Sequence, residues 1–395
     1  MVFAVVIILL IIFILLVLLD FKMGRMNHQR HPRVLPSKKT TGNYELFQNG
    51  PPFYERLFQD ISNAQKQVDI CFYIIDNDYI SENFLQILKE KAREGILVRL
   101  LLDRVGGYRV NKRMRKELQA AGVEFQFAEV PEFPYFFYKL NRRNHRKITV
   151  IDGNIGYAGG FNIGKNYIGE TPKFGNWRDY HLRLTGPAVK AFHEIFLDDW
   201  YLATGNRFPA LANEEEGQSK LKIVATDGVE LEKEFDQMIQ FAKEEILIGT
   251  PYFIPTPKLM ASLHRALEKE VTLKILVPMK ADHPFVKEAA IPYLHELYKH
   301  GANIRFFDAG FYHSKLFMID KQFADIGTAN FDRRSFFLNK EVNTFVYEEK
   351  FLKELRKAYL KDFDDAMPFN ETWLNNRSLS TKINEKIAAL LRPLL

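Results

Sequence analysis

The sequence predicts an α/β protein of two similar units that pack around a pseudo-twofold axis, with one transmembrane helix at the N-terminus. Three observations predict this fold. A spaced pattern of five residue types occurs twice, strand-like and helix-like segments follow the same order around each copy, and an uninterrupted apolar run opens the chain. The length of 395 residues also exceeds the usual size of one hydrophobic core, which favours two domains of about 150 residues.

The apolar run covers residues 2–19. As a helix it would be about 27 Å long, close to the thickness of a bilayer core. A cleavable signal peptide is the alternative, but no basic region precedes the run and no small-residue cleavage site follows Asp20. Cations follow instead, at Lys22, Arg25, Arg30, Arg33, Lys38 and Lys39. The positive-inside rule then predicts a single-pass anchor over residues 1–20, a basic linker over residues 21–45 and a body on the cytoplasmic side of the cell membrane.

The two predicted units occupy residues 46–211 and 212–350, and each should hold a mixed sheet flanked by helices. In both units a strand is followed by a helix and a second strand. These segments are residues 68–75, 84–95 and 98–102 in the first unit, and residues 245–252, 258–269 and 273–277 in the second. The stretch 212–219, which is rich in Glu and Gly, is the expected boundary.

The predicted C-terminal helical tail covers residues 351–395. From Leu379 onward, one helical stripe is apolar, formed by Ile383, Ile387, Leu390, Leu391 and Leu394. Lys382, Lys386 and Arg392 lie near this stripe. The pattern fits either a helix that docks on the body or one that lies on a membrane surface.

Composition narrows the environment and the partners. The net charge of +6 and the pI of about 9.0 favour anionic partners, phospholipid head groups or nucleic acid, without choosing between them. Cys71 is the only cysteine, which excludes an intramolecular disulfide and argues against a cysteine-based metal site. A body in a reducing compartment agrees with the predicted cytoplasmic side.

The repeated pattern begins with histidine and continues through lysine, aspartate, glycine and asparagine. Its two copies, 168 positions apart, are His145, Lys147, Asp152, Gly159, Asn162 and His313, Lys315, Asp320, Gly327, Asn330. A single His and Lys two apart on a strand could be a solvated face, but duplication at one fixed offset argues against that interpretation. We expect both copies to surround one site, an arrangement suited to phosphoryl transfer through a histidine.

Strand alternation predicts where the aspartates point. In the first copy it turns His145 and Lys147 to one face and Asp152 to the other. Asp152 is followed by Gly153, a dipeptide typical of hairpin turns, and Asp320 occupies the matching place. We therefore predict that the two aspartates fix turns and do not touch a substrate.

Several segments around the two copies carry a family resemblance. They are residues 144–153, Gly159-Gly-Phe-Asn162, Trp177-Arg-Asp179 and Asn330-Phe-Asp-Arg-Arg-Ser335. With the duplicated pattern they resemble the phospholipase D superfamily in its two-motif form and, more narrowly, bacterial cardiolipin synthases, over roughly residues 45–350. The usual bacterial synthase begins with two membrane helices. The single predicted helix makes this chain similar to the shorter, minor cardiolipin synthases of Gram-positive bacteria.

The resemblance implies an activity and the roles of the motif residues. The activity is a phosphatidyl transfer that joins two phosphatidylglycerols into cardiolipin and releases glycerol. By the same resemblance His145 is the nucleophile that becomes phosphorylated, and His313 is the general acid and then the base. The family motif also counts Asp152 and Asp320 among the catalytic positions.

The remaining groups fit the chemistry of a phosphodiester. Lys147 and Lys315 can neutralise its charge, while Asn162 and Asn330 can donate hydrogen bonds to its oxygens. A working imidazole also needs a carboxylate on its other nitrogen. One candidate follows each motif: Asp179 lies 34 residues after His145, and Glu341 lies 28 residues after His313. We expect no metal and no other cofactor, because lysines and asparagines supply the electrophilic assistance.

Other function classes share this constellation. A hydrolytic phospholipase D, a membrane-anchored phosphodiesterase or a nuclease would use the same groups, and a membrane-tethered scaffold could retain the cleft as a relic. The anchor and an aromatic loop over residues 131–140 favour membrane phospholipid over nucleic acid as the partner. The loop could insert in the membrane or pack in the core between the units. The sequence does not predict an oligomeric state.

Overall fold

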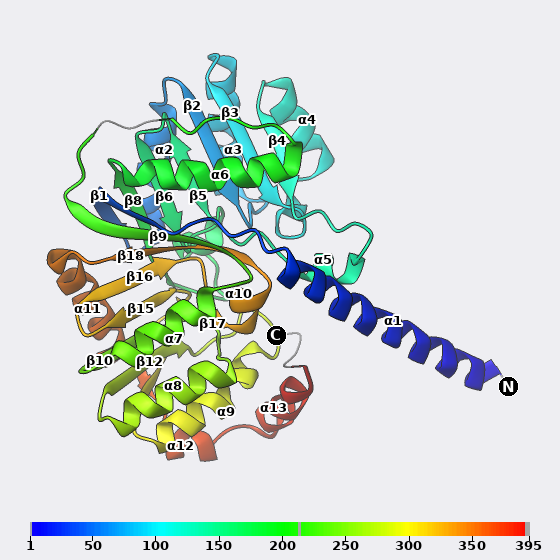
Figure 1. Cartoon of the computed structure of the whole chain (residues 1–395), viewed down its shortest axis with the longest axis vertical. Helices are drawn as coiled ribbons and strands as arrows, with labels where there is room; N and C mark the ends of the chain where they lie inside the picture. Colours follow the sequence, from blue (N-terminus) through cyan, green and yellow to red (C-terminus); the bar gives the residue numbers. More distant parts are fainter. Residues whose placement is uncertain (1, 212–214, 392–395) are drawn as a thin grey trace.

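The computed structural model of the protein describes residues 2–211 and 215–391. Two α/β units lie one above the other in Figure 1, with the apolar helix α1 (Val2–Arg30) projecting from their junction. Within the described residues, fifteen strands form one sheet that runs through both units. The two mixed sheets predicted from the sequence are thus joined edge to edge.

The strands follow the same spatial order in both units. From the junction outward, the first unit contributes β1 (Lys38–Phe47), β8 (His181–Thr185), β6 (Ile155–Gly159), β5 (Ile148–Ile151), β2 (Gln67–Phe72), β3 (Leu97–Asp103) and β4 (Glu124–Ala128). The second unit contributes β9 (Ser219–Asp227), β18 (Lys340–Val346), β16 (Phe323–Gly327), β15 (Leu316–Ile319), β10 (Glu245–Gly249), β12 (Thr272–Pro278) and β13 (Asn303–Phe307), with β19 (Met367–Pro368) added at its edge. This matching order confirms the pseudo-twofold arrangement, and the axis passes between β1 and β9.

Strand β1 belongs to both units. Its residues Lys38 to Gly42 pair antiparallel with β9, and residues Asn43 to Phe47 pair antiparallel with β8. This finding corrects the predicted basic linker over residues 21–45, since residues 21–30 continue α1 and residues 38–45 are strand. The basic residues of this segment do not indicate its backbone hydrogen bonds, because these are made with segments far along the chain. The predicted boundary near 212–219 lies partly outside the described residues, and β9 begins at Ser219.

Helices cover the sheet in both units. In the first unit they are α2 (Gly50–Ser62), α3 (Tyr79–Arg93), α4 (Lys112–Ala120), α5 (Phe136–Asn141) and α6 (Ala188–Thr204). In the second they are α7 (Leu231–Phe241), α8 (Pro257–Glu268), α9 (Val286–Lys299), α10 (Arg333–Phe337), α11 (Glu349–Asp364), α12 (Glu371–Asn375) and α13 (Leu379–Leu391). Side-chain caps explain several of the starts: Asp78, Thr256 and Asp332 each accept a hydrogen bond from the first turn of the following helix.

Helices α6 and α11 share one hydrophobic core that spans both units. Phe192 and Phe196 of α6 lie in the same buried cluster as Leu355 and Tyr359 of α11. The predicted tail therefore begins too early, because residues 351–364 belong to the body. Their apolar positions follow the helical period and are buried, which a tail free in solution would not achieve.

The last helix docks on the second unit. Helix α13 packs against α9, and its Ala388 is buried with Ile254 and Ala289. The apolar stripe predicted for this helix is not what it buries, since Ile383 is 50% and Ile387 is 37% exposed. Nothing is described for the side chains of Leu390, Leu391 and Leu394.

The apolar helix α1 leaves the body without burying its apolar part. In the described residues it is the one helix long and apolar enough to cross a membrane, with a mean hydropathy of 3.9 in its most apolar window and no buried residue there. The helix is longer than the predicted anchor and continues through Arg30, ending before Pro32. In Figure 1 its N-terminus lies far from both units.

The aromatic loop over residues 131–140 lies against α1, not between the two units. The Phe137 ring packs edge-on against the Phe13 ring of α1 at 5.9 Å, and Phe133 is 82% exposed. Of the two interpretations, the core between the units is therefore wrong. Figure 1 shows helix α5 of this loop beside the end of α1 that joins the body.

Candidate active site

The two motif histidines lie in extended segments that touch the opposite unit. They precede β5 and β15, so these strands begin later than the alternation predicted. The reason is a backbone contact with the other unit. The His145 amide donates to the Lys340 carbonyl at 3.0 Å, and the His313 amide donates to the Arg178 carbonyl at 2.8 Å. Around His313 this pairing extends to the short parallel strands β7 (Trp177–Arg178) and β14 (Phe311–Tyr312).

Each histidine takes its carboxylate from the other unit. His145 Nδ1 lies 3.0 Å from Oε2 of Glu341, and His313 Nδ1 lies 2.6 Å from Oδ2 of Asp179. Each carboxylate directly follows the residue whose carbonyl accepts from the histidine amide. The sequence identified both carboxylates but not this exchange between units. Neither histidine has its complete surroundings without the opposite unit.

The contacts set the tautomer and the charge of both imidazoles. Because a carboxylate only accepts hydrogen bonds, Nδ1 of neutral His145 donates to Glu341 and the lone pair is left on Nε2. Nδ1 of His313 faces both the Asp179 carboxylate and, at 2.6 Å, the Lys315 ammonium. Burial lowers the pKa of His145, and burial together with the nearby Lys315 lowers the pKa of His313 to about 4. Both rings are therefore neutral near pH 7, which is the form that a nucleophile needs.

The carboxylates themselves stay ionised. Burial alone would raise the pKa of Glu341 and of Asp179, but the contacts with the neighbouring histidine and lysine hold both pKa values below their usual range. Glu341 also accepts hydrogen bonds from the hydroxyls of Thr328 and Ser335 and from the side-chain amide of Asn339. These contacts fix the carboxylate that orients His145.

The two lysines are buried and differ in their partners. Lys147 Nζ donates to the His145 carbonyl at 2.8 Å, whereas Lys315 Nζ lies 2.6 Å from His313 Nδ1 and 3.5 Å from Asp179 Oδ2. Burial lowers the pKa of Lys147 to about 7 and that of Lys315 to about 8. The charge of Lys315 also contributes to lowering the pKa of Lys147 and of His145. The two motifs therefore form one electrostatic site, and a bound anion would restore the charge of both lysines.

The two motif asparagines are buried near the ends of the same segments. Asn162 Oδ1 accepts a hydrogen bond from the Ile74 amide at 3.0 Å, which fixes the side chain. Asn330 is 4% exposed, and its Oδ1 has no hydrogen-bond partner among the described residues. Asn330 therefore keeps hydrogen-bonding capacity that the protein itself does not use.

The two aspartates do what the strand alternation predicted. Asp152 and Asp320 have φ of 54° and 50°, in the hairpins that join β5 to β6 and β15 to β16. The carboxylate of Asp152 accepts from three successive amides, residues 65–67, at 2.7 to 2.9 Å. Asp320 accepts from the amides of residues 243–245 over the same range. Both carboxylates therefore bind the backbone at the far end of the strand from the histidine.

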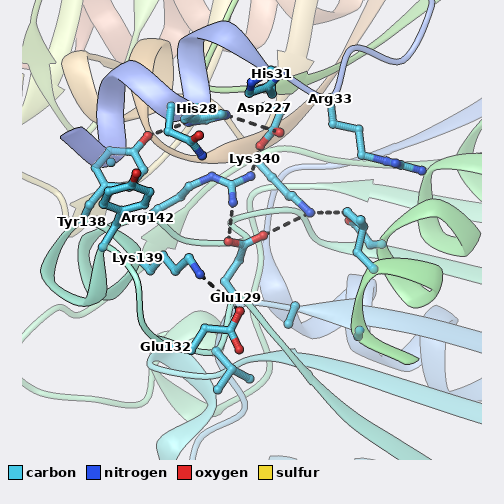
Figure 2. Close-up of a pocket in the computed structure, with 18 of the residues that line it drawn as sticks. His28, His31, Arg33, Glu129, Glu132, Tyr138, Lys139, Arg142, Asp227 and Lys340 are labelled. Atoms are coloured by element: carbon cyan, nitrogen blue, oxygen red, sulfur yellow. Dashed lines mark hydrogen bonds and ion pairs between the residues drawn. The ribbon is translucent and has the colours of Figure 1, made fainter. Parts of the chain in front are cut away.

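A cluster of buried ion pairs lies behind His145. Lys340 Nζ is 3.1 Å from Glu129 Oε1, the contact drawn between these two residues in Figure 2. It is also 3.0 Å from Asp199 Oδ1. Asp199 also accepts from the Arg146 guanidinium at 2.8 Å. Because Arg146 follows His145 and Lys340 precedes Glu341 in the chain, this cluster braces both members of the first histidine–carboxylate pair.

The same cluster reaches the anchor helix. Arg142 bridges Glu129 and Asp227, and His28 Nε2 of α1 lies 3.4 Å from Asp227 Oδ2. Figure 2 shows His28 beside Tyr138 of α5, whose hydroxyl is 2.5 Å from His28 Nδ1. Helix α1 is therefore attached to the body by polar contacts close to the first histidine.

The second histidine has different surroundings. The rings of Trp177 and Phe311 lie 5.0 Å and 5.9 Å from the His313 ring. Ser314 follows His313 where Arg146 follows His145, and its hydroxyl has no hydrogen-bond partner among the described residues. Arg178, the counterpart of Lys340, pairs with Asp362 at 2.5 Å. This half of the site is mainly aromatic where the first half is ionic.

Sequence reasoning did not single out four residues of the site. Tyr73 packs on the His145 ring at 5.1 Å, and Lys147 Nζ lies 5.5 Å from the centre of its ring. The other three are Thr328, Ser335 and Asn339, which hold Glu341. Tyr73 lies in the predicted strand 68–75 and directly follows β2, and Thr328 follows the motif glycine, but neither position carries a signal without the fold.

The arrangement is suited to in-line transfer of a phosphoryl group. A nucleophilic Nε2, a second imidazole for proton transfer and two lysines for the phosphate oxygens are all present in one site. Among residues 2–211 and 215–391, no group of three or more His, Cys, Asp or Glu side chains is placed to hold a metal ion.

Comparison with known proteins identifies the family. A family model described as a cardiolipin synthase, phospholipase D-like domain matches residues 57–200 and 235–363, one stretch in each unit. The chain belongs to the phospholipase D-like cardiolipin synthase family. It is 42% identical to the minor cardiolipin synthase ClsB of Bacillus subtilis (strain 168) over 91% of either chain. It is also 36% identical to the cardiolipin synthase of Geobacillus kaustophilus (strain HTA426), over 93% of this chain and 74% of that one.

A solved structure supports the fold of this family member. Phosphatidylserine synthase of Haemophilus influenzae Rd KW20 superposes with a TM-score of 0.72 at 14% identity, over 94% of this chain and all of that chain. The match covers both units, so the two-unit architecture extends beyond the cardiolipin synthase family.

Proposed function

We propose that the protein is a membrane phosphatidyltransferase that makes cardiolipin from two molecules of phosphatidylglycerol. The observation that carries the proposal is the pair of neutral imidazoles, each held at Nδ1 by a carboxylate of the other unit beside a buried lysine. The substrates follow from the relatives, which are cardiolipin synthases along nearly the whole chain.

In the first step His145 is the nucleophile. Its Nε2 attacks phosphorus of the first phosphatidylglycerol, and the bond between phosphorus and the terminal glycerol oxygen breaks. His313, protonated once the anionic lipid is bound, gives its Nε2 proton to that oxygen, and glycerol leaves. Lys147 and Lys315 lie where they can balance the charge on the phosphate oxygens, with Asn162 and Asn330 as hydrogen-bonding partners.

In the second step His313 acts as the base. The terminal hydroxyl of a second phosphatidylglycerol gives its proton to His313 as its oxygen attacks phosphorus. The bond from phosphorus to His145 Nε2 breaks, and cardiolipin is released. Asp179 keeps His313 in the tautomer that serves both steps, and Glu341 does the same for His145.

The sidedness of the enzyme follows from its anchor. With α1 across the membrane, the cations Lys22, Arg25 and Arg30 would stay on the cytoplasmic side together with both units. The ion pair of α1 with the body, His28 with Asp227, supports a site close to the membrane surface. Phospholipid would thus be the partner, and we expect no nucleic acid substrate. A cysteine introduced near the N-terminus should accordingly react with a membrane-impermeant thiol reagent added outside intact cells, and protection there would reverse the assignment.

Product analysis tests the proposed activity. Purified full-length protein is incubated with vesicles of phosphatidylglycerol, and lipids and glycerol are quantified. We expect cardiolipin and glycerol in equal amounts, and neither with His145→Ala. Phosphatidic acid without cardiolipin would instead support the second candidate, a hydrolytic phospholipase D, which uses water in the second step. Cleavage of DNA or RNA at a comparable rate would favour the nuclease.

A further inference from the structure

A second site lies between the anchor helix and the second unit, outside the histidine centre. It is a groove of about 520 Å³. Its walls are apolar and come from three elements: Phe13, Val17 and Phe21 of α1, Tyr138 of α5, and Phe337 and Leu338 at the end of α10. The three α1 residues are spaced four apart, so they share one face of that helix. This face looks toward the body, not toward surrounding lipid.

The deep end of the groove lies at the level of lipid chains. Phe13 is six residues before Leu19, the last residue of the apolar run, which corresponds to about 9 Å along a helix axis. The contact of Phe137 with Phe13 brings α5 to the same level. A groove with apolar walls at this depth is filled by hydrocarbon and not by water.

The shallow end of the groove is cationic. Lys22, Arg25, Arg333 and Arg334 line it at the water side of α1. No hydrogen bond or ion pair with an acidic side chain is present for Lys22, Arg25 or Arg333 within the described residues. Arg25 instead lies 5.4 Å over the Phe337 ring. Three cations without acidic partners above an apolar groove complement one class of ligand, an anionic phospholipid.

The cationic end is connected to the reacting groups. Arg334 donates to the Asn141 carbonyl at 2.8 Å, and Asn141 lies four residues before His145. Arg334 is also within electrostatic reach of Tyr73, because its charge offsets part of the rise that burial causes in the pKa of Tyr73. Tyr73 in turn packs on His145. Arg334 therefore links the cationic end of the groove to the surroundings of His145.

The number of phosphates in the product indicates which lipid binds in the groove. Lys147 and Lys315 already serve the phosphate that undergoes transfer, and they are buried at the histidines. The product carries two phosphates joined by one glycerol, so the second phosphate needs a cationic site of its own nearby. We propose that the groove binds the acceptor phosphatidylglycerol, with its acyl chains along α1, its phosphate at Lys22, Arg25 and Arg333, and its terminal hydroxyl directed toward His145. This inference rests on the proposed transferase function and adds the origin of its acceptor selectivity.

The test separates the two steps of the reaction. Full-length protein acts on vesicles of phosphatidylcholine and phosphatidylglycerol labelled in the terminal glycerol. Released glycerol reports the donor step, and cardiolipin and phosphatidic acid report whether lipid or water completes the reaction. The triple variant Lys22→Gln, Arg25→Gln, Arg333→Gln should lower the ratio of cardiolipin to released glycerol about tenfold, with a matching rise in phosphatidic acid. Lys116→Gln, an exposed cation on α4, is the matched control and should leave the ratio unchanged.

A second pair of variants tests the apolar part. Val17→Trp should fill the groove and lower the same ratio without changing any charge, whereas Leu15→Trp, on the opposite face of α1, should not. An unchanged ratio in the triple variant, an equal fall in glycerol and cardiolipin, or equal effects of the two tryptophans would each overturn the inference. If the unaltered protein formed no cardiolipin at all, the proposed function would fail first.

Discussion

His145 is backed by buried ion pairs, whereas His313 is packed against aromatic rings. Both have the same frame: a backbone bond to the opposite unit, a carboxylate from that unit on Nδ1, and a lysine two residues later. The frame comes from the duplication, and the difference comes from residues outside the repeated pattern, such as Arg146 against Ser314. The comparison teaches that the fold supplies two equivalent positions, and that residues outside the repeated pattern give them different surroundings.

The lysines show the same contrast. Lys315 lies against both members of the His313 and Asp179 pair, while Lys147 contacts the His145 carbonyl and not its carboxylate. The charge of Lys315 therefore lowers the pKa of His313 directly. A phosphate that draws the Lys315 charge toward itself would let His313 take up a proton. This coupling suits a proton donor that must be charged only when substrate is bound.

Replacing each histidine should produce the largest effect and the clearest difference between the two halves. His145→Ala should abolish both turnover and the phosphatidyl-enzyme. His313→Ala should slow turnover by about 10² to 10⁴-fold but still form the adduct from an activated diester, whose leaving group needs no proton. Acid-quenched enzyme analysed by mass spectrometry reports the adduct. An adduct that persists in His145→Ala would exchange the two roles.

The two lysines should set the alkaline limit of the reaction. Each is charged below its pKa, which is about 7 for Lys147 and about 8 for Lys315. As the pH rises through this range the cations are lost and attraction for the phosphodiester falls, so kcat/KM should decline above about pH 7. The alkaline decline of kcat should occur at higher pH than that of kcat/KM, because bound phosphate raises the pKa of both lysines. Lys147→Met and Lys315→Met should remain folded yet lose activity. A decline of kcat and of kcat/KM at the same pH would contradict this account.

The ionic and aromatic halves should differ in stability when a carboxylate is removed. Asp199→Asn leaves Arg146 and Lys340 buried with too little negative charge, so we expect a loss of about 3 to 5 kcal/mol in the free energy of unfolding. Asp362→Asn removes the partner of one cation, Arg178, at a less buried place, and should lose clearly less. Urea unfolding of both variants measures the contrast. Equal losses would show that the buried cluster has no special part in holding the first half.

The smallest difference is expected at the two aspartates. Asp152 and Asp320 bind three backbone amides each in the same geometry, so Asp152→Asn and Asp320→Asn should both lower stability by about 1 to 3 kcal/mol. Turnover per folded enzyme should stay close to that of the unaltered protein. Thermal unfolding together with activity normalised to the folded fraction tests this. An Asp320→Asn protein of full stability without activity would place that carboxylate in the chemistry.

Local patterns in the sequence predicted much of the fold and most of the site. The 168-residue offset identified both histidines, both lysines and both asparagines, and alternation turned Asp152 and Asp320 toward the hairpins. The strand at residues 68–75 and the helix at residues 258–269 were placed within a few residues of β2 and α8. The strand, the helix and the direction of the aspartates follow from side-chain periods of two and 3.6 residues, which can be recognised in a short stretch of sequence.

Contacts between distant segments could not be predicted in the same way. Glu341 lies 196 residues from His145, and Asp179 lies 134 residues from His313, so spacing alone pointed to neither pairing. The pairing of β1 with β9 joins two sheets that the sequence presents as separate. The groove between α1 and α10 likewise depends on how a membrane helix leans on the body. Each of these follows from the association of the two units and not from local propensity.

The central claim is that each carboxylate serves the histidine of the other unit. Adduct formation from a nitrophenyl ester of phosphatidic acid tests it most directly, since loss of nitrophenolate needs a nucleophile but no acid. We predict that Glu341→Gln, like His145→Ala, fails to form the phosphatidyl-enzyme. Asp179→Asn, like His313→Ala, should form it at nearly the normal rate and then turn over slowly with phosphatidylglycerol. The opposite result, with the adduct lost in Asp179→Asn and retained in Glu341→Gln, would mean that the carboxylates act within their own units and would contradict the account.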